Sequence, residues 1–161
     1  MGNIVVTVRE DHQWQGENAD VNQRVYTYSG IEQVLRRTDV ITNEQFDSGI
    51  ELITIVDDES RQTAGSFVKD SIKYMRFTNT GLNTIELAFQ KNNIDQGVLF
   101  TLEAGQNIIF GSDQFASSDM GHIVDSTYVD FTYFSEKGSF DSVKARSLQN
   151  TSKLEYIIAS S

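Results

Sequence analysis

Hydrophobic and polar residues alternate in short runs along most of this chain, a pattern typical of β-strands with one buried face. The clearest stretch is residues 72–110, where four apolar runs are separated by turn residues. Within it, Ile85, Leu87 and Phe89 alternate with polar or small residues. Asparagine and glycine at residues 79–81 and 92–97 supply the conformations that tight reversals need. We therefore predict a half-buried antiparallel meander over residues 72–110.

The same alternation recurs on both sides of this stretch. Residues 31–41 are ambiguous, because Ile31, Val34 and Leu35 would fit one helical turn whereas Val40 and Ile41 continue a β pattern. We interpret this segment as a strand, with a short helix as the alternative. The polar segments 10–22, 60–71 and 111–121 are predicted loops. Further strands are predicted over residues 3–9, 23–28, 51–56, 127–134, 140–148 and 153–160.

Strand number and spacing predict the fold class. About nine or ten short strands, roughly 8 to 15 residues apart and without a sustained helical period, indicate an all-β protein. The expected architecture is an antiparallel two-sheet sandwich of jelly-roll or Greek-key type, because a single open sheet would leave long edges free to aggregate. We expect residues 1–22 to form an N-terminal arm, made of a strand and a polar loop, and residues 23–161 to form one sandwich domain.

Composition narrows the possible partners and compartments. The 161 residues carry a net charge of −10, and Arg36 and Arg37 form an adjacent basic pair without a larger basic cluster, which argues against nucleic acid as a partner. No cysteine is present, so disulfides and thiolate-based zinc sites are excluded. No stretch approaches the roughly 20 apolar residues of a membrane span, and the first nine residues lack the pattern of a signal peptide. We expect a soluble protein without an export signal.

Candidate catalytic residues gather in one loop-like segment. A triad needs a base held by a carboxylate beside a nucleophile, and nearness in sequence does not show that arrangement. Loops are also commonly rich in serine and aspartate. We therefore expect no enzymatic activity and no cofactor. The residues considered are Ser118, Asp119, His122, Asp125 and Ser126, with His12 as the second histidine of the chain.

Two acidic or amide-rich turns could offer oxygen ligands to a calcium ion. Neither follows the alternating ligand spacing of a calcium-binding loop, and solvated turns commonly have this composition. We predict no metal site, with calcium at Asp57, Asp58 and Glu59 left as an alternative. The second group is Asn92, Asn93 and Asp95.

Apolar residues on both faces of the first and last strands predict an interface. Ile4, Val6 and Val8 alternate with Val5, Thr7 and Arg9, and Ile157 lies opposite the face that carries Leu154, Tyr156 and Ile158. Such strands need a second covering surface, so we predict a homo-oligomer, although the first strand could instead be an edge strand of its own sheet. Trp14, the one tryptophan, could anchor an interface, stack on a sugar or pin its own loop to the core. The predicted interface residues are Ile4, Val6, Val8, Trp14 and Ile157.

Several phrases of the second half resemble a known group of proteins. These are IKYMRFTNTG at residues 72–81, LEAGQ at 102–106 and LEYIIA at 154–159. They resemble the "YIRITNTG", "LxAGQ" and "LEYFIA" phrases of small β-sandwich virion proteins of tailed bacteriophages, particularly marine ones. The likeness covers about half of the chain, residues 72–110 and 140–160.

The resemblance implies a non-enzymatic virion structural protein that is assembled in the cytoplasm of a bacterial host. The leading interpretation is a capsid decoration subunit that binds the major capsid protein or another virion protein. Its oligomer would be a trimer by analogy with virion decorations. The alternative is a tail, neck or fibre component that acts as a carbohydrate-binding adhesin, with Trp14, Tyr128 and Tyr133 stacking on sugar rings.

Overall fold

The chain forms eleven described β-strands in this computed structural model, which describes residues 1–14, 17–44, 50–56, 62–63, 65–68, 71–91, 94–111 and 141–161. At residues 10–14, 17–22, 91 and 94–97 the description covers the backbone alone. The strands are β1 (Gly2–Trp14), β2 (Glu17–Ile31), β3 (Gln33–Ile41), β4 (Ile50–Val56), β5 (Ser66–Val68), β6 (Ile72–Asn79), β7 (Ile85–Lys91), β8 (Ile94–Leu102), β9 (Asn107–Gly111), β10 (Ser142–Ser147) and β11 (Ser152–Ser160).

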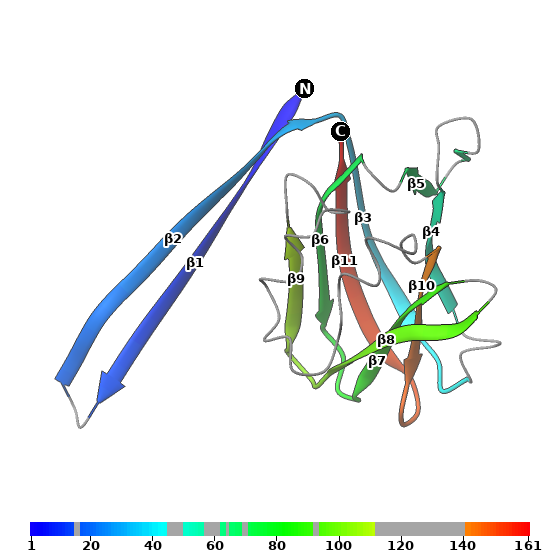
Figure 1. Cartoon of the computed structure of the whole chain (residues 1–161). Coiled ribbons are helices and arrows are strands. Elements are labelled where there is room, and N and C mark those ends of the chain that lie inside the picture. The colour runs from blue at the N-terminus through cyan, green and yellow to red at the C-terminus, as the bar shows by residue number, and fades with distance from the viewer. Residues whose placement is uncertain are drawn as a thin grey trace.

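Two sheets pack face to face, and a separate hairpin of β1 and β2 projects from them (Figure 1). One sheet has the order β5-β4-β10-β7-β8 and the other β3-β11-β6-β9. The chain crosses between the sheets from β3 to β4, from β5 to β6, from β6 to β7, from β8 to β9, from β9 to β10 and from β10 to β11. This alternation is the strand order of a jelly roll, with β5 added in parallel beside β4. The predicted all-β sandwich is therefore confirmed.

The predicted meander over residues 72–110 is wrong in its pairing. β6 pairs with β9 and β7 pairs with β8, so β6 and β9 lie in one sheet and the β7-β8 hairpin in the other. The stretch is one long hairpin folded over both sheets. Its turn lies between Lys91 and Ile94, which leaves Gly97 inside β8 rather than in the reversal. The prediction that one face of each strand is buried was correct, because an alternating strand buries one face whichever sheet it joins.

The core lies between the two sheets. The Phe77 ring lies 5.9 Å from Phe89, edge to face, and 6.1 Å from Tyr156, in a stacked arrangement. Tyr156 donates a hydrogen bond of 2.8 Å to the Asp39 carboxylate. Burial, together with the carboxylate beside the hydroxyl, raises the pKa of Tyr156 to about 12. Leu154, Tyr156 and Ile158 all have no exposed surface, as the pattern of the last strand predicts.

One buried amide joins the crossings at the end of the sandwich away from the chain termini. Asn79 Nδ2 donates to the carbonyl oxygens of Asn83 at 2.8 Å and Leu102 at 2.9 Å. Its Oδ1 accepts hydrogen bonds from the Ser152 hydroxyl at 3.0 Å and the Gly81 amide at 3.1 Å. All the hydrogen-bonding groups of this side chain are used, so burying it carries little desolvation penalty.

The structure also corrects predictions for the polar segments 10–22 and 60–71. Residues 10–22, predicted as a polar loop, extend β1 and β2 into a hairpin that turns between Trp14 and Glu17. Cross-strand hydrogen bonds join backbone groups, so polar residues can form such a ladder. The predicted boundary between residues 22 and 23 falls inside β2, and the arm reaches Ile31. The strand predicted over residues 31–41 is confirmed by β3, and the alternative of a short helix is excluded. The predicted loop at 60–71 contains β5 with Phe67 in the core.

Candidate functional site

The most unusual feature of the molecule is the β1-β2 hairpin, here called the arm. Its strands have 13 and 15 residues, which at about 3.3 Å per residue gives a length of roughly 40 Å. The longest strands of the sandwich, at nine residues, span only about 30 Å. The arm starts beside both chain termini and leaves the sandwich obliquely, with its tip well away from the body (Figure 1). An element of this shape can reach another molecule.

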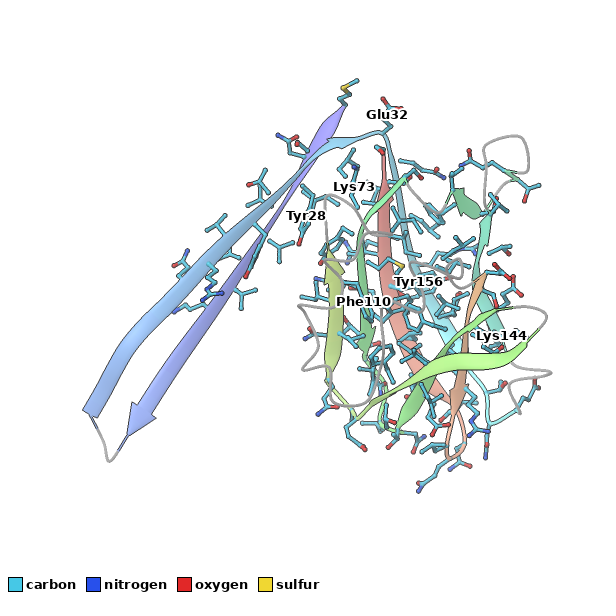
Figure 2. All side chains as sticks on the ribbon, in the orientation of Figure 1. Tyr28, Glu32, Lys73, Phe110, Lys144 and Tyr156 are labelled. Atoms are coloured by element: carbon cyan, nitrogen blue, oxygen red, sulfur yellow. The ribbon has the colours of Figure 1, made fainter. Side chains whose placement is uncertain are left out.

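The base of the arm is attached to the outer face of the β3-β11-β6-β9 sheet. Tyr28 and Ile31 are buried there against Tyr74 and Ala159. The rings of Tyr28 and Tyr74 lie 5.5 Å apart at 46°, and Figure 2 shows Tyr28 pointing from the arm toward the sandwich. The partly buried residues of this base cluster are Ile4, Val6, Ile109 and Ile157.

A glycine makes the close approach at the base possible. A Cβ atom on Gly111 would overlap the Tyr28 hydroxyl and ring, so any larger residue would push this ring away. Gly30 lies near the end of β2, and its φ of +72° is in the left-handed region that glycine adopts without strain. Both glycines therefore determine how the arm leaves the sandwich.

The arm exposes apolar side chains on both faces, at its base and beyond it. Val5 and Val25 are 60% and 57% exposed on the face turned away from the sandwich. Tyr26 and Val8 continue the inward face and are 42% and 39% exposed. A two-stranded hairpin in water is only marginally stable unless a further strand or surface covers it. This part of the arm has the composition of a surface that binds another protein.

The outer face below the base cluster carries a small ion-pair network. Arg36 and Arg76 both donate to the Glu155 carboxylate, at 3.1 Å and 2.8 Å. These hydrogen bonds hold the pKa of Glu155 below its ordinary value, and the hydrogen bond from Arg36 contributes most. The Arg36 side chain is nevertheless 69% exposed. Lys153 lies on the same face, two residues before Glu155 on β11.

The structure brings three of the five predicted interface residues together. Ile4, Val6 and Ile157 meet in the base cluster, so the second face of the last strand is covered by the arm of the same chain. Val8 lies beyond the cluster, and Trp14 ends β1 opposite Glu17, with its side chain outside the described residues. The covering surface that these strands need is therefore partly intramolecular.

The sequence interpretation missed the main contacts of the base cluster. Tyr28, Tyr74 and Ile109 belong to it, and none was predicted to lie at a contact between the arm and the body. The alternation of Tyr26 and Tyr28 was a signal that one face of residues 23–28 is apolar. Nothing in sequence spacing shows that Gly111 lies beneath Tyr28, because the two are 83 positions apart and meet only through the fold.

The predicted chemical candidates lie mostly outside the described residues. Within the described part of the chain, no group of three or more histidine or acidic residues could hold a metal ion. No helix in that part is long and apolar enough to cross a membrane. The candidates outside it are Ser118, Asp119, His122, Asp125 and Ser126, the acidic turn Asp57, Asp58 and Glu59, the amides Asn92 and Asn93, and the tyrosines Tyr128 and Tyr133; the side chains of His12 and Asp95 are likewise not described.

Comparison with known proteins gives no family. No family model and no curated protein matches the chain. A solved structure titled "Bacillus endospore appendages form a novel family of disulfide-linked pili" is similar at a TM-score of 0.36 and 10% identity, over 83% of this chain and 93% of that one. A TM-score at this level does not establish a common fold.

Proposed function

We propose that this chain is a non-enzymatic bacteriophage virion protein, a homo-oligomeric decoration subunit that attaches to the assembled head through its arm. The observation that carries the proposal is a jelly-roll body with a hairpin arm that extends beyond it and exposes valines on both faces. Jelly rolls are common in viral capsid proteins, and the sequence phrases resemble virion proteins. The capsid protein is the proposed partner of the arm.

The physical argument concerns the exposed arm. Its open strand edges offer unpaired backbone groups to an added strand, and Val5 and Val25 offer apolar surface beside them. Burying two valines removes about 3 kcal/mol of unfavourable hydration, before the cost of ordering the arm. One contact of this size is weak, but an oligomer that docks several arms at once gains from multivalency.

The first experiment removes the exposed part of the arm and keeps its base. Val6 and Tyr26 are paired across the hairpin, so residues 7–25, which include the exposed Val8 and Val25, can be replaced by an Asn-Gly turn that joins them. The shortened protein retains Ile4, Val6 and Tyr28 and should fold, as judged by circular dichroism. We expect it to lose attachment to purified undecorated capsids in a co-sedimentation assay. Undiminished attachment would contradict the proposed role of the arm.

A point substitution with a matched control separates the apolar contact from arm length. Val25→Ser on the outward face should weaken attachment several-fold. Leu99→Ser on β8 is the control, because the exposed fraction of Leu99 is 51%, close to the 57% of Val25. Leu99 lies in the β5-β4-β10-β7-β8 sheet, which the arm base does not contact in the described part of the chain. Antibody labelling of intact particles provides the independent readout. Label over the whole head supports decoration, whereas label confined to the tail tip would show an adhesin.

A further inference from the structure

The outer face of the β3-β11-β6-β9 sheet is basic directly beside the arm base, where Arg36 and Arg76 flank Ile157. Arg36, Arg76 and Lys153 lie there beside one carboxylate, Glu155, so the described residues of this patch sum to +2. The chain as a whole carries −10. We call these four residues the basic patch. A patch whose sign opposes that of the whole molecule favours an acidic partner.

The distal part of the arm has the complementary charge. Residues 10–22 contain four acidic residues, Glu10, Asp11, Glu17 and Asp20, and neither lysine nor arginine, so this part sums to −4 with histidine neutral. The backbone register places Glu10 opposite Asn22 and Glu17 opposite Trp14, so all four lie in the outer part of the hairpin.

The arm of the same chain does not bring these two surfaces together. Its base contacts the adjoining part of the outer face, at Tyr74, Ala159 and Ile157. From there the arm runs away from the sandwich, and its tip ends clear of the body (Figure 1). Arg36 remains 69% exposed. Within one chain, the outer part of the arm backbone and the basic patch therefore lie apart (Figure 1).

We propose that the acidic tip of one subunit's arm lies on the basic patch of a second copy of this chain. The docked tip would extend the contact that each arm base already makes with its own sheet, so one outer face would hold the base of its own arm and the tip of its neighbour's. This inference rests on the homo-oligomer of the proposed function and names how the copies join. Opposite charges on two parts of every subunit make each copy both donor and acceptor of an arm, as closed homo-oligomers require.

Two charge-reversed variants test this pairing. In the tip variant, Glu10→Lys, Asp11→Lys and Glu17→Lys change the sum over residues 10–22 from −4 to +2, which makes the tip of the arm basic. In the patch variant, Arg36→Glu and Lys153→Glu make the patch acidic. Each variant alone presents like charges at every contact and should lose roughly tenfold or more in association constant, measured by light scattering and analytical ultracentrifugation.

Mixing the two variants restores every pairing where the two kinds of subunit alternate, as in a dimer or tetramer, and two of the three pairings in a trimer. The basic tips of the first fit the acidic patches of the second, and the acidic tips of the second fit the intact patches of the first. We expect the mixture to associate roughly tenfold or more tightly than either variant alone, with wild-type size recovered if the oligomer has an even number of subunits. Lys144→Glu is the matched control, since Lys144 lies on β10 of the other sheet, away from the arm (Figure 2), and should leave assembly unchanged.

Three outcomes would overturn the inference: a wild-type chain that stays monomeric at all accessible concentrations, single variants that assemble like the wild type, or a mixture that stays dissociated while both variants remain folded by circular dichroism. Failure of the proposed function is separately visible. In that case the wild-type chain would form oligomers and mixing the two variants would restore them, but these oligomers would not attach to capsids.

Discussion

Tyr28→Ala should detach the arm from the body without unfolding the sandwich. Tyr28 is 9% exposed, and its ring contacts Tyr74 and lies over Gly111. The cluster that it joins is separate from the core between the sheets, where Phe77 lies. Loss of the ring therefore removes the main attachment of the arm and leaves the core packing unchanged.

The size of the effect follows from buried area. A buried tyrosine removes about 150–250 Å² from water, worth roughly 4–6 kcal/mol at about 25 cal/mol per Å². This is an upper bound, because the hydroxyl is polar and the detached arm still covers part of the surface. We expect the free energy of arm opening to fall by about 3 kcal/mol. This corresponds to an increase of roughly a hundredfold in the opening equilibrium constant.

Native-state hydrogen exchange measures this opening directly. Amides of β1 and β2 near the base, such as those of Val6 and Tyr26, should exchange about a hundred times faster in Tyr28→Ala, whereas amides of β11 should stay protected. Gly111→Ala should act in the same direction, because its Cβ atom displaces the Tyr28 ring. The comparison variant is Phe77→Ala in the core, which should cost about 3–5 kcal/mol and lower the melting temperature on the order of 10 °C.

Two results would refute this reasoning. If Tyr28→Ala lowers the melting temperature as much as Phe77→Ala, the arm and the sandwich form one cooperative unit. If exchange in β1 and β2 does not change, the Tyr28 ring does not hold the arm base.

Three further predictions concern the body. Gly81→Ala should destabilise the protein by about 2–4 kcal/mol in chemical denaturation, because its Cβ would overlap the Lys153 backbone and disrupt the hydrogen bonds made there; an unchanged midpoint would show that this crossing can shift freely. Asn79→Ala should cost about 3 kcal/mol by leaving buried carbonyl groups unpaired, and a loss below about 1 kcal/mol would contradict the importance of this amide. The pKa of Tyr156 is about 12 in the folded protein and about 10 when unfolded, so stability should be fully retained below pH 10 and fall from pH 10 to 12 as the unfolded state loses its proton first. Tyr156→Phe should remove that part of the fall in denaturation midpoints measured across this range, and an identical pH profile in the variant would exclude the contribution of Tyr156 beside Asp39.

The strand content and the buried faces were accessible from the sequence because they depend on local alternation. Ile85, Leu87 and Phe89 are all 3% exposed or less, as their spacing predicts. The need for a second covering surface on Ile157 was also visible, since both faces of the last strand are apolar. These properties require no knowledge of which strands are neighbours.

Strand pairing and the form of the arm were decided by the tertiary structure. β11 lies between β3 and β6. Its residue Glu155 therefore binds both Arg36, which is 119 positions away in the sequence, and Arg76, which is 79 positions away. Alternation specifies the buried face of a strand but not its neighbour, so it could not distinguish a meander from a hairpin folded over two sheets. The polar residues 10–22 became strands because backbone groups supply the hydrogen bonds of a hairpin ladder. The base of the arm, where Tyr28 lies over Gly111, exists only because the folded sheet brings that glycine beneath the ring.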